Sequence, residues 1–448
     1  MYFTTLNRKE NTMYPSEGLQ TALNYMREMS VQDGRVYHQY VPVVTDSTTI
    51  GEFGKPILDS ANVNVLNDFV SLLRKVVYTA VYNKTFNNPL AQLEGERMPL
   101  GSFVEDTYVN PAEAHAFDVN DFAGLLEKYE AKMAVQYLAV NSDLQYQVTV
   151  TREKIRNAFT SWDNLESFVS SMVNSLFNGA YIDHYKQTKG LVLSAYTGNN
   201  IQIETVSAVN SESTAKALVK KIRATFAKMQ IPSTRYNAWN KVKGGDLELK
   251  TWSDPEDIVI LISADVEANV DVDVLAYAFN MDRASFLAKR IVIDDFSVDG
   301  VDGSAIQCAV MDKAWFKIKQ QYFAMDEFYN MQNRSWQYGL NDVRMVNYSL
   351  FANAVVFATS MPTVDATVIK AGSATASVAE GAKVTVPFTL TPPNATTTVT
   401  ASSSAEGKAT VEVKGKTVEI TGVDAGSATI TLTAGAGITD TIAVTVTE

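Results

Sequence analysis

The longest regular pattern of apolar positions in this chain lies between residues 163 and 189. The apolar side chains recur there every three or four positions, at Leu165, Phe168, Val169, Met172, Val173, Leu176, Phe177, Ala180, Tyr181 and Tyr185. The spacing predicts one amphipathic helix, Asp163–Lys189, about 39 Å long. We expect Asp163 to be its N-cap, with Glu166 at the capping-box position, and Gly190 to end it. A helix about twice the usual length suggests a mechanical spine.

Short patterns precede this spine helix. Residues 1–55 are polar and interrupted by proline and glycine, so we expect an extended N-terminal arm with one short helix at Ser16–Met29. Apolar positions on one face predict a second helix at Asn62–Arg74, and an alternating pattern predicts a strand at Lys75–Phe86.

Residues 87–150 form a long excursion that is rich in chain-breaking residues, including Pro89, Gly95, Pro99 and Gly101. The excursion returns through a strand-like segment at residues 145–150. Such a pattern fits a projecting two-stranded hairpin better than a packed domain.

Mixed elements are expected after the spine, and they make residues 1–360 one α+β unit. The expected elements are a helix at Ser211–Met229, a buried strand in Asp257–Ser263, a short helix at Val272–Phe279, strands at Arg290–Asp294 and Ala305–Met311, and strands at Trp315–Tyr329 and Val343–Ala358 that complete the sheet.

The composition changes sharply near Met361 and Pro362. Beyond them Phe388 is the only aromatic residue, and Thr, Ala, Val and Gly dominate. Short alternating runs occur at Lys383–Leu390, Thr396–Thr400, Ala409–Val413, Thr417–Thr421, Ala428–Thr433 and Thr441–Thr447. About seven such strands predict an immunoglobulin-like β-sandwich at residues 363–448. Low-complexity disorder is the alternative, and the strict alternation favours order.

Composition and charge exclude several classes of protein. A chain of 448 residues is expected to form two or three domains, and its formal charge of −12 argues against a protein that coats nucleic acid. Cys308 is the only cysteine, so neither an intrachain disulfide nor a thiolate metal cluster is expected. The N-terminus has no apolar segment typical of a secretory signal, and no apolar run is long enough to cross a membrane.

No constellation of residues indicates an enzyme, and no catalytic residue, cofactor site or metal site is predicted. The chain has no Gly-x-Ser-x-Gly elbow, no phosphate-binding loop and no dinucleotide fingerprint. The acidic run Asp294, Asp295, Asp299 and Asp302 hints at calcium, but its spacing favours a solvated turn. His184 lies on the inner stripe of the spine, which favours a hydrogen-bonded core histidine over a ligand.

Three further patterns have simpler interpretations. One is a basic helix face formed by Lys216, Lys220, Lys221, Arg223 and Lys228, which is typical of a solvated helix surface. Residues 274–289 superficially resemble a helix-turn-helix reader, but nearby aspartates and the net charge oppose DNA reading. An isopeptide crosslink is a further possibility, and its donor and acceptor residues would be Lys128, Lys132, Asn347 and Asn353. Unlinked surface lysines are the stronger interpretation.

Several segments together resemble the major head protein of small Bacillus-type podoviruses with protein-primed replication. These segments are Asn87–Leu90, Met98–Gly101, Ala158–Trp162, Glu166–Ser171, Lys221–Thr225, Asp271–Ala276, Ala278–Met281 and Phe351–Val355. Residues 422–434 also resemble the closing strands of a bacterial group-two immunoglobulin-like domain. The order of arm, hairpin, spine helix and mixed domain is similar to the tailed-bacteriophage major capsid fold. Residues 105–145 and the tail, which lacks a buried tryptophan, depart from these patterns.

The resemblance implies an α+β capsid fold followed by an all-β sandwich. Its parts would be an arm at 1–55, an extended hairpin loop at 87–150, the spine at 163–189, an axial domain at about 200–335 and closing strands at 340–360. Copies would form the pentamers and hexamers of an icosahedral virion shell around packaged double-stranded DNA. A scaffolding protein and a portal would assist assembly in the bacterial cytoplasm, no membrane would be involved, and the sandwich could hold host glycans. The alternative is a bacterial surface adhesin.

The resemblance also leads to hypotheses about single residues. We expect Ser102, Phe103, Glu105, Tyr108 and Phe117 of the hairpin to contact the spine helix of a neighbouring subunit. Because one chain must fit rings of five and six copies, the breakers Pro89, Gly95, Pro99 and Gly101 are expected to act as hinges.

Overall fold

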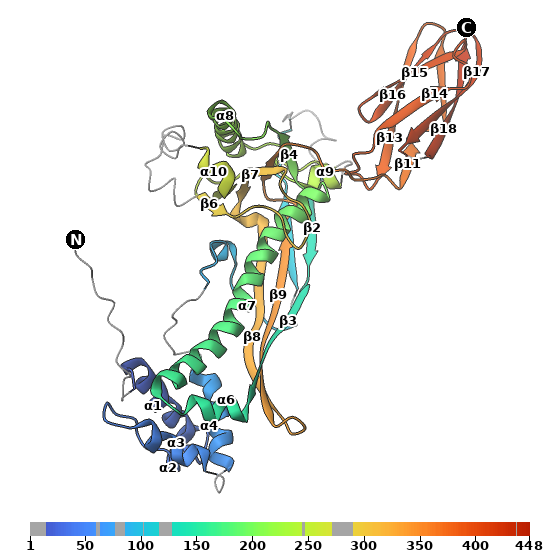
Figure 1. Ribbon diagram of the computed structural model, residues 1–448. Helices are drawn as coiled ribbons and strands as arrows, with labels where there is room; N and C mark the ends of the chain where they lie inside the picture. Colours follow the sequence, from blue (N-terminus) through green and yellow to red (C-terminus); the bar gives the residue numbers. More distant parts are fainter. Residues whose placement is uncertain are drawn as a thin grey trace.

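The computed structural model describes residues 15–59, 63–76, 86–101, 103–115, 128–243, 247–270, 290–435 and 437–448. The molecule is elongated rather than globular, as Figure 1 shows. A helical cluster lies at one end, a long helix and a three-stranded sheet run from it to a mixed domain, and an all-β domain stands beyond.

The N-terminal part forms a helical cluster instead of the predicted extended arm. Its helices are α1 Glu17–Gln32, α2 Tyr37–Tyr40, α3 Ile50–Leu58, α4 Val63–Val76 and α6 Arg152–Ala158. Ser16 caps α1, and Thr49 and Glu52 form a capping box at α3. The predicted helix at Ser16–Met29 corresponds to α1. The prediction of an extended arm is otherwise wrong for residues 15–55, because apolar residues spaced along these polar segments meet in one core with Phe69 and Trp162. Residues 1–14 lie outside the described residues.

The predicted helix at 62–74 corresponds to α4, and the predicted strand at 75–86 is not found where it can be examined. Its first two residues continue α4, residues 77–85 lie outside the described part, and residue 86 follows in irregular structure.

The spine helix is present and longer than predicted: α7 spans Trp162–Thr197. At 36 residues it is about 54 Å long. The side chain of Ser161, not Asp163, caps the helix by accepting from the backbone of Asn164. Gly190 lies inside the helix, which ends at Gly198.

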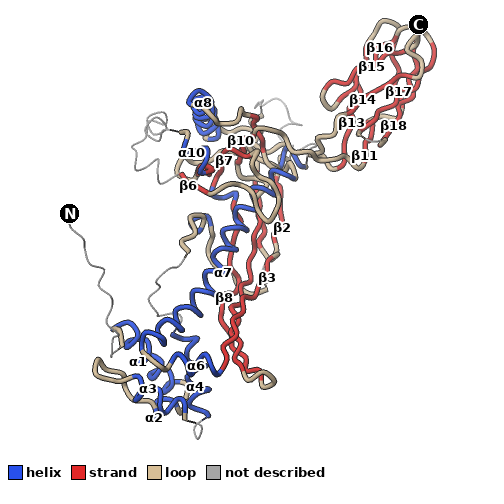
Figure 2. The backbone as a smooth tube through the Cα atoms, in the orientation of Figure 1, coloured by secondary structure: helices blue, strands red, loops and turns tan. Residues whose placement is uncertain are grey.

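A three-stranded antiparallel sheet runs beside the spine, as Figure 2 shows. Its order is β3-β9-β8, and its strands are β3 Ser142–Thr151, β8 Phe316–Asn330 and β9 Ser335–Tyr348. Apolar residues of β3, β8 and β9 join the core around the first half of α7. The sequence prediction placed β8 and the end of β9 in the central sheet, whereas both belong to this separate one.

A two-stranded hairpin is present, and it pairs β1 Val104–Val109 with β2 Met133–Leu138. The predicted return strand at residues 145–150 is not part of it, because that segment lies in β3 and pairs with β9. A single 3₁₀ turn, η1 Ala91–Leu93, precedes it. Residues 116–127 lie outside the described part.

The mixed domain is a five-stranded sheet with helices on both faces. Its order is β4-β10-β7-β5-β6, and only β7 runs against the other four strands. The strands are β4 Gln202–Thr205, β5 Ile258–Ser263, β6 Arg290–Ile293, β7 Ile306–Asp312 and β10 Ala354–Ala358. The remaining elements are α8 Glu212–Met229, α9 Trp239–Val242, α10 Ala264–Ala268 and η2 Lys313–Trp315. The predicted helix at 272–279 lies outside the described residues.

A hydrophobic core lies on each face of this sheet, because successive side chains of a strand point to opposite faces. Ala309 and Met311 of β7 face the end of α7, and Cys308 and Val310 face α8. The Cys308 thiol is fully buried, and this burial raises its pKa far above the ordinary value. The single cysteine is therefore a packing residue.

The C-terminal part is a β-sandwich, as predicted. One sheet has the order β11-β13-β16-β15 and the other β12-β18-β17-β14. The strands are β11 Val368–Ala371, β12 Thr375–Ala379, β13 Lys383–Thr391, β14 Val399–Ser403, β15 Ala409–Lys414, β16 Thr417–Gly422, β17 Gly426–Ala434 and β18 Ile438–Thr447. Inward residues such as Ile430 and Leu432 are fully buried. The alternation of apolar and polar residues therefore corresponds to an ordered core and not to low-complexity disorder.

Candidate assembly surfaces

The inner face of the β1–β2 hairpin packs on its own chain. The Tyr108 ring stacks on Phe351, and its hydroxyl donates to the Lys250 carbonyl at 2.5 Å. Ala134 is buried in the same cluster with Leu249. Tyr108, predicted to contact a neighbour, is therefore engaged within the chain.

Polar contacts fix the same face. Lys317 Nζ lies 2.9 Å from Asp106 Oδ1, and the Ser349 hydroxyl donates to Asp106 Oδ2 at 2.5 Å. The Gln136 amide donates to the Tyr348 carbonyl. These bonds satisfy the inward polar groups, so the hairpin lies along the body instead of projecting from it.

The outer face of the hairpin carries more apolar than polar side chains, and most of them are exposed. Glu105, Thr107 and Val109 pair with Tyr137, Val135 and Met133, so all six side chains share this face. Tyr137 is 67 % exposed and Met133 55 %. Phe103 and Leu100, just before β1, are 69 % and 72 % exposed. We call Leu100, Phe103, Val109, Met133 and Tyr137 the outer hairpin face.

Sequence reasoning found only part of this face. Phe103 and Glu105 were predicted contacts, whereas Ser102 and Phe117 lie outside the described residues. Tyr137 and Met133 were missed, although their alternation with buried Ala134 and Leu138 carried the signal.

The base of the hairpin is tied to the spine through buried charges. Arg344 of β9 is fully buried, and its Nη2 lies 2.7 Å from Glu94 Oε1. His184 Nε2 lies 2.6 Å from Asp342 Oδ2, and His184 Nδ1 lies 3.9 Å from the Glu94 carboxylate. The prediction that His184 is a hydrogen-bonded core histidine is confirmed. Glu94 links the hairpin base to both β9 and α7.

The four proposed hinge residues differ in their surroundings. Gly95 donates to the Ile318 carbonyl, and Pro99 accepts from Gln321, so both are attached to β8. Pro89 is half-buried. Gly101 has φ +75° and open space around its Cβ position, so it is the best placed of the four to act as a hinge, which stays a prediction.

Two aspartates of the acidic run after β6 contact a lysine of the spine helix. Lys189 of α7 is nearly buried, and its Nζ lies 2.8 Å from Asp294 Oδ1 and 3.2 Å from Asp295 Oδ1. Partial burial acts to raise the pKa of Asp294, but hydrogen bonds from Lys189 and Tyr185 together outweigh it and hold that pKa below its usual value. Among the residues that the structure describes, no group of three or more His, Cys, Asp or Glu side chains could hold a metal ion.

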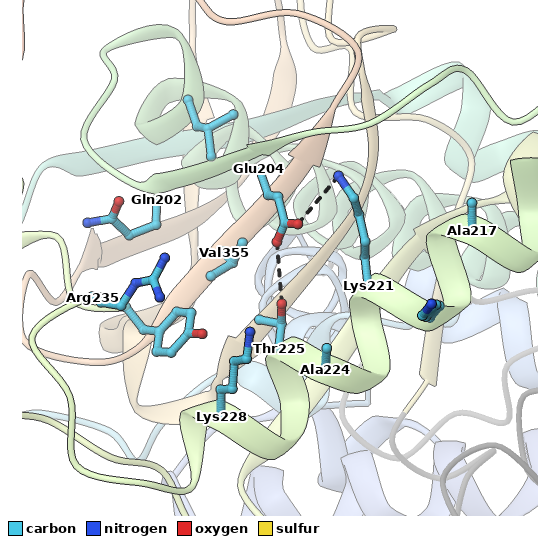
Figure 3. A pocket seen from close by; sticks show the side chains of 12 residues that line it. Gln202, Glu204, Ala217, Lys221, Ala224, Thr225, Lys228, Arg235 and Val355 are labelled. Carbon is cyan, nitrogen blue, oxygen red and sulfur yellow. Dashed lines mark hydrogen bonds and ion pairs between the residues drawn. The ribbon is translucent and has the colours of Figure 1, made fainter.

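The basic face of α8 borders a groove of about 700 Å³ at the β4 edge of the sheet (Figure 3). The cationic residues Lys220, Lys221, Lys228 and Arg235 line it. Lys221 lies 3.4 Å from Glu204, and Glu204 also accepts from Thr225. Lys220, Lys228 and Arg235 are exposed and form no ion pair with any other described residue.

The contacts of the four residues considered for an isopeptide crosslink do not indicate such a bond. Lys132 Nζ lies 3.5 Å from Glu113, and Asn347 donates to the Ala139 carbonyl. Asn353 is buried and bonded to Thr251. Lys128 is exposed.

The sandwich is joined to the mixed domain by a cluster of asparagines. Asn199 donates to the Asn394 carbonyl at 2.7 Å, and Asn394 donates to Asn200 Oδ1 at 2.7 Å and to the Gly198 carbonyl. Lys241 Nζ holds this loop through Asn199 Oδ1 at 2.5 Å. Burial lowers the pKa of Lys241 to about 8.

None of the described helices is long and apolar enough to cross a membrane.

Comparison with known proteins agrees with the fold. A family model of the Phi29-like phage major capsid protein matches residues 23–358, and one of the bacterial Ig-like domain (group 2) matches residues 363–446. The major capsid protein of Bacillus phage PZA is 30% identical over 350 residues, which are 78% of this chain and 75% of that protein. The corresponding protein of Bacillus phage B103 is also 30% identical, over 77% of this chain and 74% of its own length. The capsid structure of Staphylococcus phage Andhra matches with a TM-score of 0.51 and 14% identity, over 62% of this chain and 86% of that one.

The family match covers the helical cluster, spine and mixed domain, which favours a shell protein over the adhesin alternative. The predicted capsid fold with an immunoglobulin-like sandwich is thereby confirmed. This chain belongs to the Phi29-like phage major capsid protein family and is a phage major capsid protein, a structural component of the virion.

Proposed function

We propose that copies of this chain form pentamers and hexamers, and that the outer hairpin face of each copy packs against the next. One observation carries the proposal: Val109, Met133 and Tyr137 stand exposed on the side of the hairpin that its own chain leaves uncovered, and Leu100 and Phe103 are exposed just before β1. Exposed apolar patches of this kind mark interaction sites in soluble proteins.

Burial of these side chains would supply the contact energy. Each large side chain removed from water contributes about 1.5–3 kcal/mol before ordering costs. The contact is modest, but a closed shell repeats it in every subunit, and symmetry then multiplies it. The exposed Ile182 on the spine is an apolar side chain that such a hairpin could cover.

The experiment compares two sets of variants of the full chain. The double variant Phe103→Ser/Tyr137→Ser is expected to fold, because both positions are exposed. It is also expected to form few or no shells in electron micrographs, because it lacks the apolar contact area. Glu105→Gln, on the same face but polar, is the matched control and should assemble normally. A Phe103→Ser/Tyr137→Ser variant that makes shells as readily as the wild type would contradict the proposal.

Partners other than copies of the chain follow from the shell role. We propose a scaffolding protein and a portal during assembly in the host cytoplasm, and packaged double-stranded DNA inside the shell. The net charge of −12 suits a wall that lies near DNA without binding its phosphates.

We further propose that the sandwich stands on the outer surface of the shell and holds host glycans there. We also propose that the shell can close without it. The sandwich has its own core, and the asparagine cluster attaches it at one end. A chain ending after Thr359 should therefore still form shells; failure of that chain to assemble would make the sandwich structural.

A further inference from the structure

Two surfaces of the mixed domain carry opposite charge. The first, which we call the α8 groove, is the groove lined by Lys220, Lys221, Lys228 and Arg235. With Glu204 as its only carboxylate among the lining residues, it has a net charge of +3. Three of the four cations have no carboxylate partner among the described residues, and Figure 3 shows Lys228 on α8 and Arg235 on the loop that follows it.

The second surface, which we call the acidic end, lies beyond β5 and β6. It consists of Asp265, Asp294, Asp295, Asp299 and Asp302. Asp265 and Asp302 are exposed, as are Asp294, Asp295 and Asp299 at 62 %, 55 % and 75 % of their side chains. Two lysines of α7 neutralise part of it, Lys189 in direct contact and Lys186 at 3.9 Å from Asp299. Its net charge is −3.

The two surfaces cannot meet within one chain. The α8 groove lies at the β4 edge, and the acidic end lies at the β6 edge of the same sheet. Five strands separate the edges by about 19 Å. Most of the acidic end also lies on the other face, because Lys189 belongs to α7, which covers the side of the sheet opposite α8. The exception is Asp265, because its helix α10 packs on the α8 side.

Opposite edges are where a ring needs complementary patches. A cyclic ring uses a head-to-tail contact, in which two different patches of one subunit meet the reverse pair on its neighbours. We propose that the α8 groove of one copy receives the acidic end of the adjacent copy within each ring. The inference rests on the proposed function, since it names a second contact inside the same rings.

Charge explains what this contact adds. Copies that each carry −12 repel one another, and a local pair of +3 and −3 patches offsets that repulsion and selects one orientation. Contacts of this kind act mainly on the rate and register of association. A nucleic acid is the less favoured occupant of the α8 groove, because the net charge opposes it.

The test is a charge swap in the full chain. Lys228→Glu/Arg235→Glu and Asp265→Lys/Asp299→Lys are each expected to lower the yield of shells about tenfold. The chain that carries all four substitutions should recover to within about threefold of wild type, because each groove then meets a complementary end. Recovery cannot be explained by misfolding. Lys55→Glu/Lys154→Glu, an equal charge change at exposed lysines of the helical cluster, is the matched control and should assemble normally.

Three results would overturn the inference. The first is a yield of shells from Lys228→Glu/Arg235→Glu that equals the wild-type yield. The second is a yield from the chain with all four substitutions that is as low as the yield from either double variant. The third is loss of binding to a double-stranded DNA fragment in the groove variant without recovery in the swap, which would assign the groove to phosphate. The hairpin proposal is tested independently, because Phe103→Ser/Tyr137→Ser changes none of these charged residues.

Discussion

The capsid domain and the immunoglobulin-like sandwich solve the problem of apolar surface in different ways. The sandwich turns its apolar residues inward between two sheets, with Ile430, Leu432 and Ile442 fully buried. The capsid domain buries several separate cores and still leaves Phe103, Tyr137 and other large side chains in solvent. A domain that is complete by itself thus sits on one that copies of the chain are proposed to complete.

The largest effect is expected from the sandwich core. Ile430→Ala should lower the free energy of unfolding of the sandwich by about 3–4 kcal/mol, because it leaves a cavity between the two sheets. Calorimetry should show one transition moving down while the capsid-domain transition stays in place. Joint movement of both transitions would mean that the two domains are one cooperative unit.

A smaller effect is expected where the hairpin base meets the spine. Glu94→Gln removes the charge that faces buried Arg344, and should destabilise the capsid domain by about 2–3 kcal/mol, less than for a fully buried pair because Glu94 is partly exposed. Amide hydrogen exchange in residues 86–101 should accelerate. Glu96→Gln, an exposed carboxylate on the same segment, is the control and should change nothing. Unchanged exchange in Glu94→Gln would show that the ion pair does not hold the base.

The smallest effect concerns the joint between the two regions and depends on pH. The pKa of Lys241 is about 8 in the folded chain and 10.5 in an unfolded one, so the unfolded chain binds more protons between these values. Stability should therefore rise with pH from about 8 to about 10.5. The gain should be about 1 kcal/mol, because Lys241 is partly exposed and its hydrogen bonds to Asn199 and Ile201 offset part of the burial cost. Chemical denaturation of Lys241→Met should lack this rise; an equal rise in the variant would assign it to another group.

The same comparison explains which elements the sequence could predict. Six of the eight sandwich strands, all except β11 and β12, were found because one face of each sheet is buried, so apolar residues alternate. The spine was found only as far as Lys189, because Leu191, Val192 and Leu193 are all buried and no apolar stripe continues. Gly190 within such a run is not a signal for a helix end.

Elements held by distant polar contacts could not be predicted. Within residues 15–55, the part of the helical cluster beyond Ser16–Met29 was also missed, because each of its segments contributes only a few apolar residues to the shared core. The hairpin docks through Asp106, Gln136 and Asn110, which bond to groups more than a hundred residues away. The spacing of apolar residues along the chain does not indicate which distant polar groups form hydrogen bonds. The α8 groove was visible only as a basic helix face, since Arg235 joins it through the fold.

The outer hairpin face is the most direct test of the account. Electron cryomicroscopy of assembled shells would show whether Phe103, Met133 and Tyr137 are covered by an adjacent copy. We expect all three to be buried at a subunit contact in both five- and six-fold rings. Shells in which these side chains remain open to solvent would contradict the claim that neighbouring copies complete the capsid domain.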